Sequence, residues 1–405
     1  MRMATMVTPY ARPPGRGAAL DPGSALPLYA RSLAQAEAAL GYDVNVVGPH
    51  FAGASPWHDG SVSIHSGFRH GRLDATFRIE RAVRAIGEPV IHLQHELFAF
   101  GGIATALALP VSMHRLRRRG YRFLTTLHGV IPRDAITRAF VRSNGLRAPL
   151  ALVRAAWHEL LLSICHRSDV IHVHEAEHAR WLRDDYNYPG PIEIVPMGTG
   201  LAFRASDRDE SRERLGISPS AHVLLFFGYL LERKGIVPFL AAVPGMLADD
   251  PDLTILLVGV VPDHTPASEA LGERIEALAR HPRLRRLGFV PDAEVATVFD
   301  IADALILPYT FTMSASFPLS IALGRGTPVL LSRTFAGSYA EAPSLFAPDP
   351  LGIRTVVKRF FSDAAFRSAV TDDTTSRSSG RSWHAMATRL VEIVRGIRDR
   401  SERGA

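Results

Sequence analysis

A glycine and two cations follow an apolar run near the middle of the chain, and together they could hold a phosphate group. The run is Val223–Phe227, and after it come Gly228, Arg233, Lys234 and Gly235. A continuous apolar run of this length predicts a buried parallel strand. Ligands of parallel sheets bind beyond the carboxyl ends of the strands, where a glycine lets the backbone approach them closely. The pattern indicates a site for a diphosphate leaving group, and an ordinary strand-loop-helix with two solvated charges is the alternative.

A second loop has the composition to bind the same anion. The apolar run Ala304–Leu307 is followed by Ser314, Ser316 and Pro318, with Gly326 further on. Ser316 is a favoured helix N-cap, and Pro318 fits a first helical turn. A helix N-terminus presents unpaired N–H groups and a positive dipole to an anion. We therefore expect Ser314, Ser316 and the helix start to bind phosphate, with an ordinary capped helix as the alternative.

Polar residues of the N-terminal half also follow strand-like runs. His128 follows Phe123–Leu127, and His95 and Glu96 lie at the end of the run that begins at Val90. Because the carboxyl ends of parallel strands meet at one edge of a sheet, these side chains could face one cleft. Alternatively, His128 could be a hydrogen-bonded residue inside the wall between two domains, and the Gln-His-Glu turn could be purely structural.

Two further patterns each have a functional and a structural interpretation. Gly23 and Ser24 precede a helical stretch, so this loop could touch a ligand in the cleft or could simply cap the helix. His172 and His174 alternate on one strand-like run, as metal ligands do, but a strand among helices more often buries such residues with hydrogen bonds. We expect no metal site.

Strand-like runs alternate with helix-length segments along the whole chain. Such alternation predicts parallel sheets with helices on both faces. With 405 residues, we expect two doubly wound domains, residues 1–200 and 201–375, followed by a linker and an amphipathic final helix in residues 376–405. The stretch Thr371–Arg381 is polar and predicts the linker. The strand-like runs are Met3–Thr8, Val44–Val47, Val90–Gln94, Phe123–Leu127, Val170–His174, Ile192–Val195, Val223–Phe227, Leu253–Val258, Leu284–Leu287, Ala304–Leu307 and Pro328–Leu331.

Composition restricts the class of protein. An apolar content of 47% with 21% charged residues is typical of a globular protein. Cys165 is the only cysteine, so no intrachain disulfide can form, and a cytoplasmic location is expected. The N-terminal apolar run breaks at Pro9, which argues against a signal peptide. The longest apolar stretch, Leu97–Val111, is shorter than the ~20 residues of a spanning helix, so we expect no transmembrane segment.

The net charge of +6 suits anionic ligands. Its densest cluster is formed by Arg115, Arg117, Arg118 and Arg119 at the end of an expected helix. The cluster could contact an anionic lipid or a phosphorylated acceptor, which would place the protein at the inner face of a membrane, or it could be a solvated helix end. Binding of nucleic acid is disfavoured, because no aromatic residues interleave with a basic stripe.

The order of these motifs is similar to that of the GT-B glycosyltransferases, in particular the retaining enzymes of glycosyltransferase family 4. The motifs are Pro22–Ser24, Thr126–Gly129, Gly228–Gly235 and Pro308–Val329. Gln94–Glu96 with Phe100–Gly102, and Ser382–Trp383 at the start of the final helix, extend the likeness over nearly the whole chain.

The resemblance implies two Rossmann-like domains that face a cleft, with a C-terminal crossover helix. It implies transfer, with retention, of a sugar from a UDP- or GDP-sugar to a hydroxyl of a polysaccharide, glycolipid or specialised metabolite, without cofactor or metal. Catalytic roles then fall to His128 beside the sugar and to Lys234 and Arg233 beside the diphosphate. Donor binding falls to Gly228, Lys234, Ser314 and Ser316, and the acceptor side to Gly23, Ser24, His95 and Glu96.

The sequence departs from the family pattern at the glutamate pair that contacts the transferred sugar and the donor ribose. Met313 and Ile321 occupy these positions, and Tyr229 replaces the usual arginine, whose charge Arg233 could supply. Two alternatives to glycosyl transfer therefore stay open: a non-catalytic protein that binds sugar nucleotides, and a different enzyme on the same fold, such as a sugar-nucleotide epimerase or a transferase that makes a non-glycosidic bond.

Overall fold

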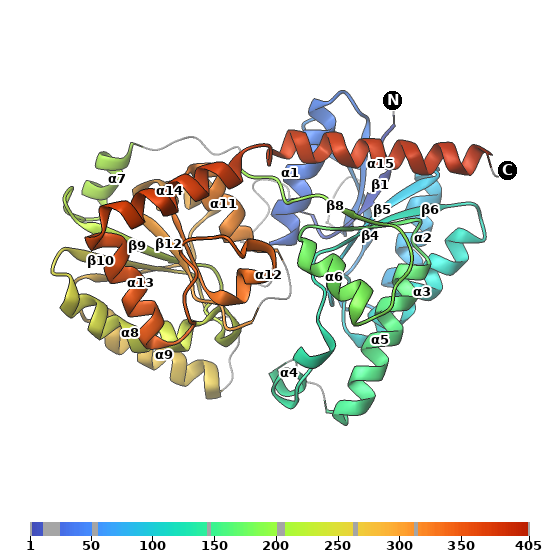
Figure 1. Ribbon diagram of the computed structural model, residues 1–405. Helices are drawn as coiled ribbons and strands as arrows, with labels where there is room; N and C mark the ends of the chain where they lie inside the picture. The colour runs from blue at the N-terminus through green and yellow to red at the C-terminus, as the bar shows by residue number, and fades with distance from the viewer. Residues whose placement is uncertain are drawn as a thin grey trace.

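The computed structural model describes residues 2–10, 25–50, 56–143, 147–200, 207–261, 266–311 and 315–403. Two α/β halves lie side by side, each with its own sheet, and a long C-terminal helix reaches from the second half to the first (Figure 1). Within the described residues, the predicted parallel sheets with helices on both faces are confirmed.

The first sheet has the strand order β3-β4-β2-β1-β5-β6-β7-β8, and its pairs are parallel except for β3 with β4. Its strands are β1 (Thr5–Val7), β2 (Val44–Pro49), β3 (Trp57–Asp59), β4 (Val62–Phe68), β5 (Val90–His95), β6 (Arg122–Leu127), β7 (Val170–Val173) and β8 (Ile192–Ile194). Its helices are α1 (Leu26–Ala39), α2 (Ala75–Ile86), α3 (Ile103–Arg117), α4 (Arg138–Ser143), α5 (Leu150–His166) and α6 (Ala176–Asp184). The sequence did not predict β3 and β4, because polar residues interrupt the apolar run there.

The second sheet has the order β11-β10-β9-β12-β13 and is parallel throughout its described strands. Its strands are β9 (His222–Phe227), β10 (Leu253–Val258), β11 (Leu284–Gly288), β12 (Ala304–Leu307) and β13 (Val329–Leu331). Its helices are α7 (Arg208–Arg214), α8 (Ile236–Asp249), α9 (Pro266–Ala279), α10 (Asp292–Ile301), α11 (Phe317–Arg325), α12 (Ala336–Tyr339), α13 (Pro350–Ser362) and α14 (Ala364–Ser378).

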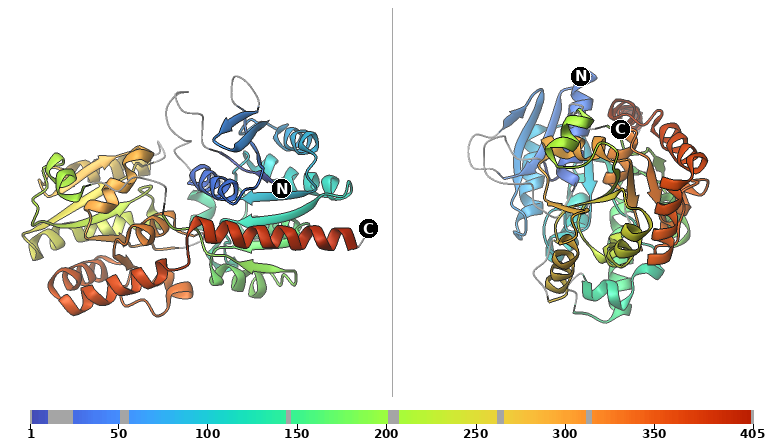
Figure 2. Two further views of the ribbon diagram at one scale, coloured as in Figure 1. Left: turned by 90° about the horizontal axis from the view of Figure 1, so that it is seen from above. Right: turned by 90° about the vertical axis from the view of Figure 1, so that its left-hand side faces the viewer.

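The final helix, α15 (Trp383–Arg403), packs against α1 on one face of the first sheet (Figure 2). Its buried stripe is Trp383, Met386, Leu390, Ile393, Val394 and Ile397. At roughly 1.5–3 kcal/mol for each fully buried large apolar side chain, this stripe is enough to hold the helix in place. The predicted amphipathic crossover helix is therefore present, and helices α2, α3 and α5 cover the opposite face of the sheet.

The predicted polar linker Thr371–Arg381 is wrong over most of its length. Helix α14 continues to Ser378, and only four residues separate it from α15. Asp363 caps the start of the helix, where its side chain accepts a hydrogen bond from the Phe366 amide, and the helix buries Phe366, Val370 and Thr374 at four-residue spacing. Three buried residues per four turns were too few to reveal the helix in so polar a segment.

No helix in the described part of the chain combines the length and the apolar character that spanning a bilayer requires.

Candidate active site

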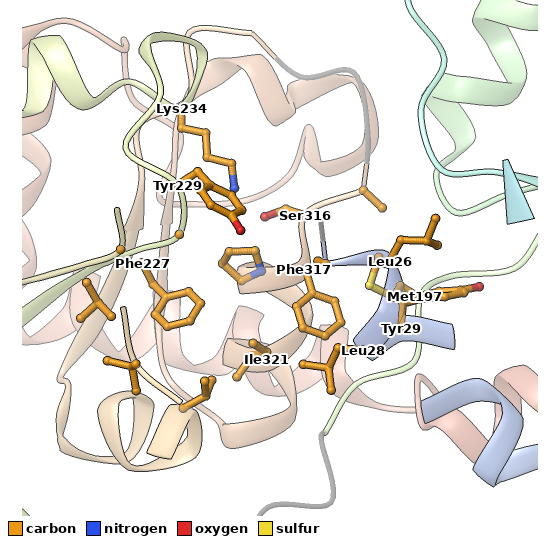
Figure 3. Close-up of a pocket in the computed structure, with 18 of the residues that line it drawn as sticks. Leu26, Leu28, Tyr29, Met197, Phe227, Tyr229, Lys234, Ser316, Phe317 and Ile321 are labelled. Atoms are coloured by element: carbon orange, nitrogen blue, oxygen red, sulfur yellow. The ribbon is translucent and has the colours of Figure 1, made fainter. Parts of the chain in front are cut away.

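A cavity of about 230 Å³ lies between the two halves, and both contribute side chains to its wall (Figure 3). From the first half come the start of α1, Glu96, His128 and Met197. From the second half come residues that follow the carboxyl ends of four neighbouring strands, β9, β10, β11 and β12. Ligand binding beyond the carboxyl ends of a parallel sheet is the arrangement expected for doubly wound folds.

The predicted first loop places Gly228 and Lys234 together on this wall. A side chain at Gly228, which has φ +120°, would put its Cβ 3.1 Å from Lys234 Nζ, so the absence of a side chain leaves room for the ammonium group. Lys234 ends a short 3-10 helix, Glu232–Lys234, and Gly235 follows with φ +79°. A Cβ at Gly235 would lie 1.8 Å from the Pro308 carbonyl oxygen, so only glycine fits where the two loops meet.

The Lys234 ammonium group lies over the Tyr309 ring, 5.4 Å from its centroid. Tyr309 Oη is 3.2 Å from Ser316 Oγ, so one tyrosine contacts both the lysine and the serine. Across the described residues, neither Lys234 nor Arg233 has a carboxylate within ion-pair distance. The structure thus brings the two loops into one pocket, with positive charge that an anionic ligand can neutralise.

Ser316 is the N-cap of α11, as its position in the sequence predicted. Its Oγ accepts a hydrogen bond from the Leu319 amide at 3.4 Å, Pro318 lies in the first turn, and Gly326 is the C-cap. The helix N-terminus opens into the pocket beside Lys234. Ser314, the other predicted hydroxyl donor, lies outside the described residues, as do Gly23, Ser24 and Met313.

His128 lies on the opposite wall, after β6, and a chain of buried polar groups holds it. His128 Nε2 is 2.8 Å from Gln94 Oε1. An amide oxygen only accepts hydrogen bonds, so Nε2 donates and Nδ1 is left as an acceptor. The Tyr29 ring packs edge-on at 4.5 Å between centroids. Burial, and then the neighbouring histidines, hold the pKa of His128 well below its usual range, so the imidazole is neutral at pH 7.

The chain continues from Gln94 into the core. Gln94 Nε2 approaches the His92 ring, and His92 Nε2 is 2.7 Å from Thr126 Oγ1. Thr126 Oγ1 is 2.8 Å from His172 Nδ1, and His172 Nε2 donates to the Val195 carbonyl oxygen at 2.9 Å. Hydrogen bonds thus run from the pocket wall across three neighbouring strands, and they fix the orientation of His128.

The remaining N-terminal residues that the sequence singled out separate in space. Glu96 lines the pocket, whereas His95 is buried and is not among the pocket-lining residues. Burial lowers the pKa of His95 to about 4. His174 Nδ1 lies 3.2 Å from the Val195 carbonyl oxygen, next to His172. Over the described ranges, no group of three or more His, Cys, Asp or Glu side chains is arranged to hold a metal ion.

The pocket wall is apolar where the family pattern has a carboxylate. Ile321 lies on α11 and is 2% exposed, and Phe227 and Val295 share its wall. From the sequence, Tyr29 received no site role, and Gln94 and Tyr309 were included only as parts of longer motifs. Tyr309 lies two residues after the end of β12 at Leu307, a position that could have revealed its role.

Comparisons with known proteins agree with this geometry. Residues 27–203 match the family model described as "Glycosyltransferase Family 4", and residues 207–342 match "Glycosyl transferases group 1". A D-inositol 3-phosphate glycosyltransferase of Streptosporangium roseum is 29% identical over 223 residues, 51% of this chain and 50% of the relative. Its counterpart in Segniliparus rotundus is 30% identical over 148 residues, 36% of this chain and 32% of the relative. The chain spans about half or less of the length of these curated relatives.

Solved structures are similar over almost the whole chain. Sucrose-phosphate synthase from Thermosynechococcus elongatus has a TM-score of 0.73 at 18% identity, covering 98% of this chain and 99% of that one. Anabaena HepE in complex with UDP has a TM-score of 0.64 at 13% identity, covering 97% and 100%. At these identities the likeness shows the fold, which is the predicted GT-B arrangement.

Proposed function

Because the chain belongs to the family 4 and group 1 glycosyltransferases with the GT-B fold, we propose that it moves a sugar from a nucleotide-diphosphate sugar to a hydroxyl group. The observation that carries this proposal is the convergence of Lys234, Ser316 and Gly228 on one pocket that His128 faces from the other half. The transfer would retain the configuration of the anomeric carbon and need no metal.

The two loops suit a departing diphosphate. As the bond between the anomeric carbon and the diphosphate oxygen breaks, negative charge grows on the diphosphate. The Lys234 ammonium group, the Arg233 guanidinium group and the N–H groups at the start of α11 would stabilise that charge. In a site fixed before the reaction, loss of one such donor costs about 10²–10³ in kcat.

The opposite wall suits the sugar. His128 is neutral, with Nε2 donating to Gln94, so Nδ1 can accept a hydrogen bond from a sugar hydroxyl without adding positive charge beside an oxocarbenium-like centre. Glu96 and the start of α1 lie on the same side and would face the acceptor. His95 would support this wall from behind, because it does not line the pocket.

The donor is proposed to be a UDP- or GDP-sugar. The acceptor would be a hydroxyl of a polysaccharide, a glycolipid or a specialised metabolite, and D-inositol 3-phosphate, which the names of the curated relatives give, belongs in the acceptor panel. A cytoplasmic location is part of the proposal, since the single cysteine, Cys165, is buried and unpaired.

Ligand-induced stabilisation and turnover test the proposal together. UDP-, GDP-, ADP- and TDP-sugars are added to the protein, and a ligand that binds the native form raises its melting temperature. The donor so identified is then used for turnover with the acceptor panel. Lys234→Ala should lower kcat by about 10²–10³, whereas Lys358→Ala, on α13 away from the pocket, should leave it unchanged. Near-normal turnover of Lys234→Ala would remove the proposed role of the lysine.

One observation favours a second candidate, a protein that binds a sugar nucleotide without transferring the sugar. Ile321 places an alkyl chain where the family pattern has a carboxylate. Melting-temperature shifts without donor hydrolysis or transfer to any acceptor would support this candidate. A product that NMR identifies as an epimerised sugar nucleotide, or as a non-glycosidic conjugate, would instead indicate a different enzyme on the same fold.

A further inference from the structure

Five large apolar side chains lie exposed on or next to α2 and α3, and none of them lines the pocket. They are Leu73, just before α2, and Phe77, Ile103, Leu107 and Val111, and each is between 51% and 79% exposed. Half of the large apolar residues found exposed in the described chain thus fall within residues 73–111. Single exposed apolar residues are ordinary, but a contiguous group marks an interaction surface. We call this group the α2–α3 face.

The two helices run side by side on one face of the sheet (Figure 1), so residues on their exposed sides point outward from the same layer. Ser112 Oγ on α3 lies 2.7 Å from Glu80 Oε1 on α2. Just before the helices, a methyl group added at Gly101 would lie 3.0 Å from the Gly71 amide nitrogen. Both helices therefore begin at the same end of the sheet and run in the same direction.

Each helix continues the same face with positive charge. On α2, Leu73 and Phe77 are followed at spacings of four and three residues by Arg81 and Arg84. On α3, Ile103, Leu107 and Val111 are followed at spacings of three and four residues by His114, which the formal charge counts as neutral, and by Arg118 at the C-cap. Residues three and four apart share one side of a helix. The α2–α3 face is therefore apolar at the beginning of both helices and basic towards their ends.

The charge around this face is strongly one-sided. Residues 69–119 contain nine arginines and four carboxylates, so this segment carries +5 of the chain's formal +6. Three of the four carboxylates are neutralised: Asp74 pairs with Arg78, Glu80 with Arg115 and Glu88 with Arg398. Within the described residues, Arg69, Arg72, Arg81 and Arg84 are exposed and have no ion-pair partner.

The structure changes which arginines are available. Arg115 Nε bonds Glu80 Oε1 at 3.0 Å, and Arg117 bonds Asp169 Oδ2 at 2.7 Å, so two of the four arginines of the predicted cluster are occupied within the protein. Arg118 and Arg119 stay exposed. The free positive charge is therefore spread along α2 as well as at the end of α3.

We propose that the α2–α3 face docks on an anionic lipid bilayer and that the acceptor hydroxyl belongs to a lipid. The claim about the acceptor rests on the proposed function, whereas the docking does not. An apolar strip that continues into unpaired arginines matches the boundary between acyl chains and anionic headgroups. The face also begins close to the pocket along the chain, because α3 starts at Ile103, a few residues after Glu96, and Glu96 lines the pocket. A headgroup at the bilayer surface could enter the pocket from this side.

Sedimentation with vesicles tests the docking. The full chain should sediment with vesicles of phosphatidylcholine and phosphatidylglycerol, should sediment less with phosphatidylcholine alone, and should be released by high salt, which screens the arginines. The double variant Phe77→Asp, Leu107→Asp should bind at least about tenfold more weakly, and Arg81→Gln with Arg84→Gln should lose the preference for anionic vesicles. Leu351→Asp is the matched control, because Leu351 is 73% exposed on α13 of the other half.

The outcomes separate this inference from the proposed function. Failure of the unchanged chain to bind anionic vesicles would overturn the docking, as would equal losses in the control and the double variant. The docking would also be overturned if sedimentation velocity without vesicles showed a dimer, and if the double variant abolished this dimer but still bound vesicles. Vesicle binding without any sugar transfer would leave the docking standing and refute the transfer. Transfer to water-soluble acceptors only, with none to lipid-linked acceptors on bound vesicles, would refute the lipid-linked acceptor.

Discussion

Replacement of Glu37 by glutamine should stabilise the protein at neutral and alkaline pH. Glu37 lies on the inner side of α1 and is 1% exposed. Neither carboxyl oxygen has a hydrogen-bond partner among the described residues. Burial raises the pKa of this carboxyl from 4.5 to about 8, so the folded protein keeps a proton that the unfolded chain releases.

The sign and size follow from this difference in pKa. A carboxyl whose pKa is raised on folding makes its full contribution to the free energy of unfolding below pH 4.5. That contribution is lost as the pH rises from 4.5 to about 8, the pKa in the folded protein. With about 1.36 kcal/mol for each pH unit, the free energy of unfolding should fall by about 3 kcal/mol at pH 7 and by up to about 5 kcal/mol at pH 9. Glutamine has nearly the same shape and does not ionise, so it removes this loss.

Urea unfolding at pH 5, 7 and 9 measures the effect. The native protein and Glu37→Gln should have similar stability at pH 5, and the variant should be more stable at pH 7 and still more so at pH 9. Glu402→Gln, an exposed carboxylate near the end of α15, is the matched control and should follow the native protein at every pH. A difference between native and Glu37→Gln that does not change with pH would refute the reasoning.

Three other predictions concern the site. Gln94→Leu removes the hydrogen-bond acceptor of His128 Nε2 and should lower kcat about tenfold or more, with little change in the KM for the donor. Gln94→Glu keeps an acceptor oxygen and should lose less activity. Equal losses of kcat in the two variants would exclude the positioning role of Gln94. Because the pKa of His128 lies well below its usual range, its titration should not appear in the pH profile of kcat/KM near pH 6.5. The profiles of the native protein and of His128→Gln should therefore have the same shape there, and an inflection that only the native protein shows would contradict the neutral imidazole. Gly235→Ala should lower the melting temperature and the donor affinity together, because its Cβ would clash with the Pro308 carbonyl oxygen at φ +79°, and an unchanged melting temperature would contradict the close approach.

Several features of the fold and site followed from the sequence because their causes are local. The apolar run Val223–Phe227 forms β9, since a buried parallel strand needs apolar residues on both faces. Ser316, Pro318 and Gly326 mark the two ends of α11 through caps that depend on neighbouring residues only. The loops after β9 and β12 then had to share one edge of a parallel sheet.

Tertiary structure alone decided which groups are charged, paired or free. The Gln94 partner of His128 lies 34 residues away in the chain, and the Glu80 partner of Arg115 lies 35 residues away. Glu37 becomes buried without a hydrogen-bond partner only when α1 packs in the folded chain. The pKa of a side chain and its ion pairs depend on groups that only folding brings close to it. Sequence spacing therefore predicts on which element a charged side chain lies, whereas the folded chain determines its partners.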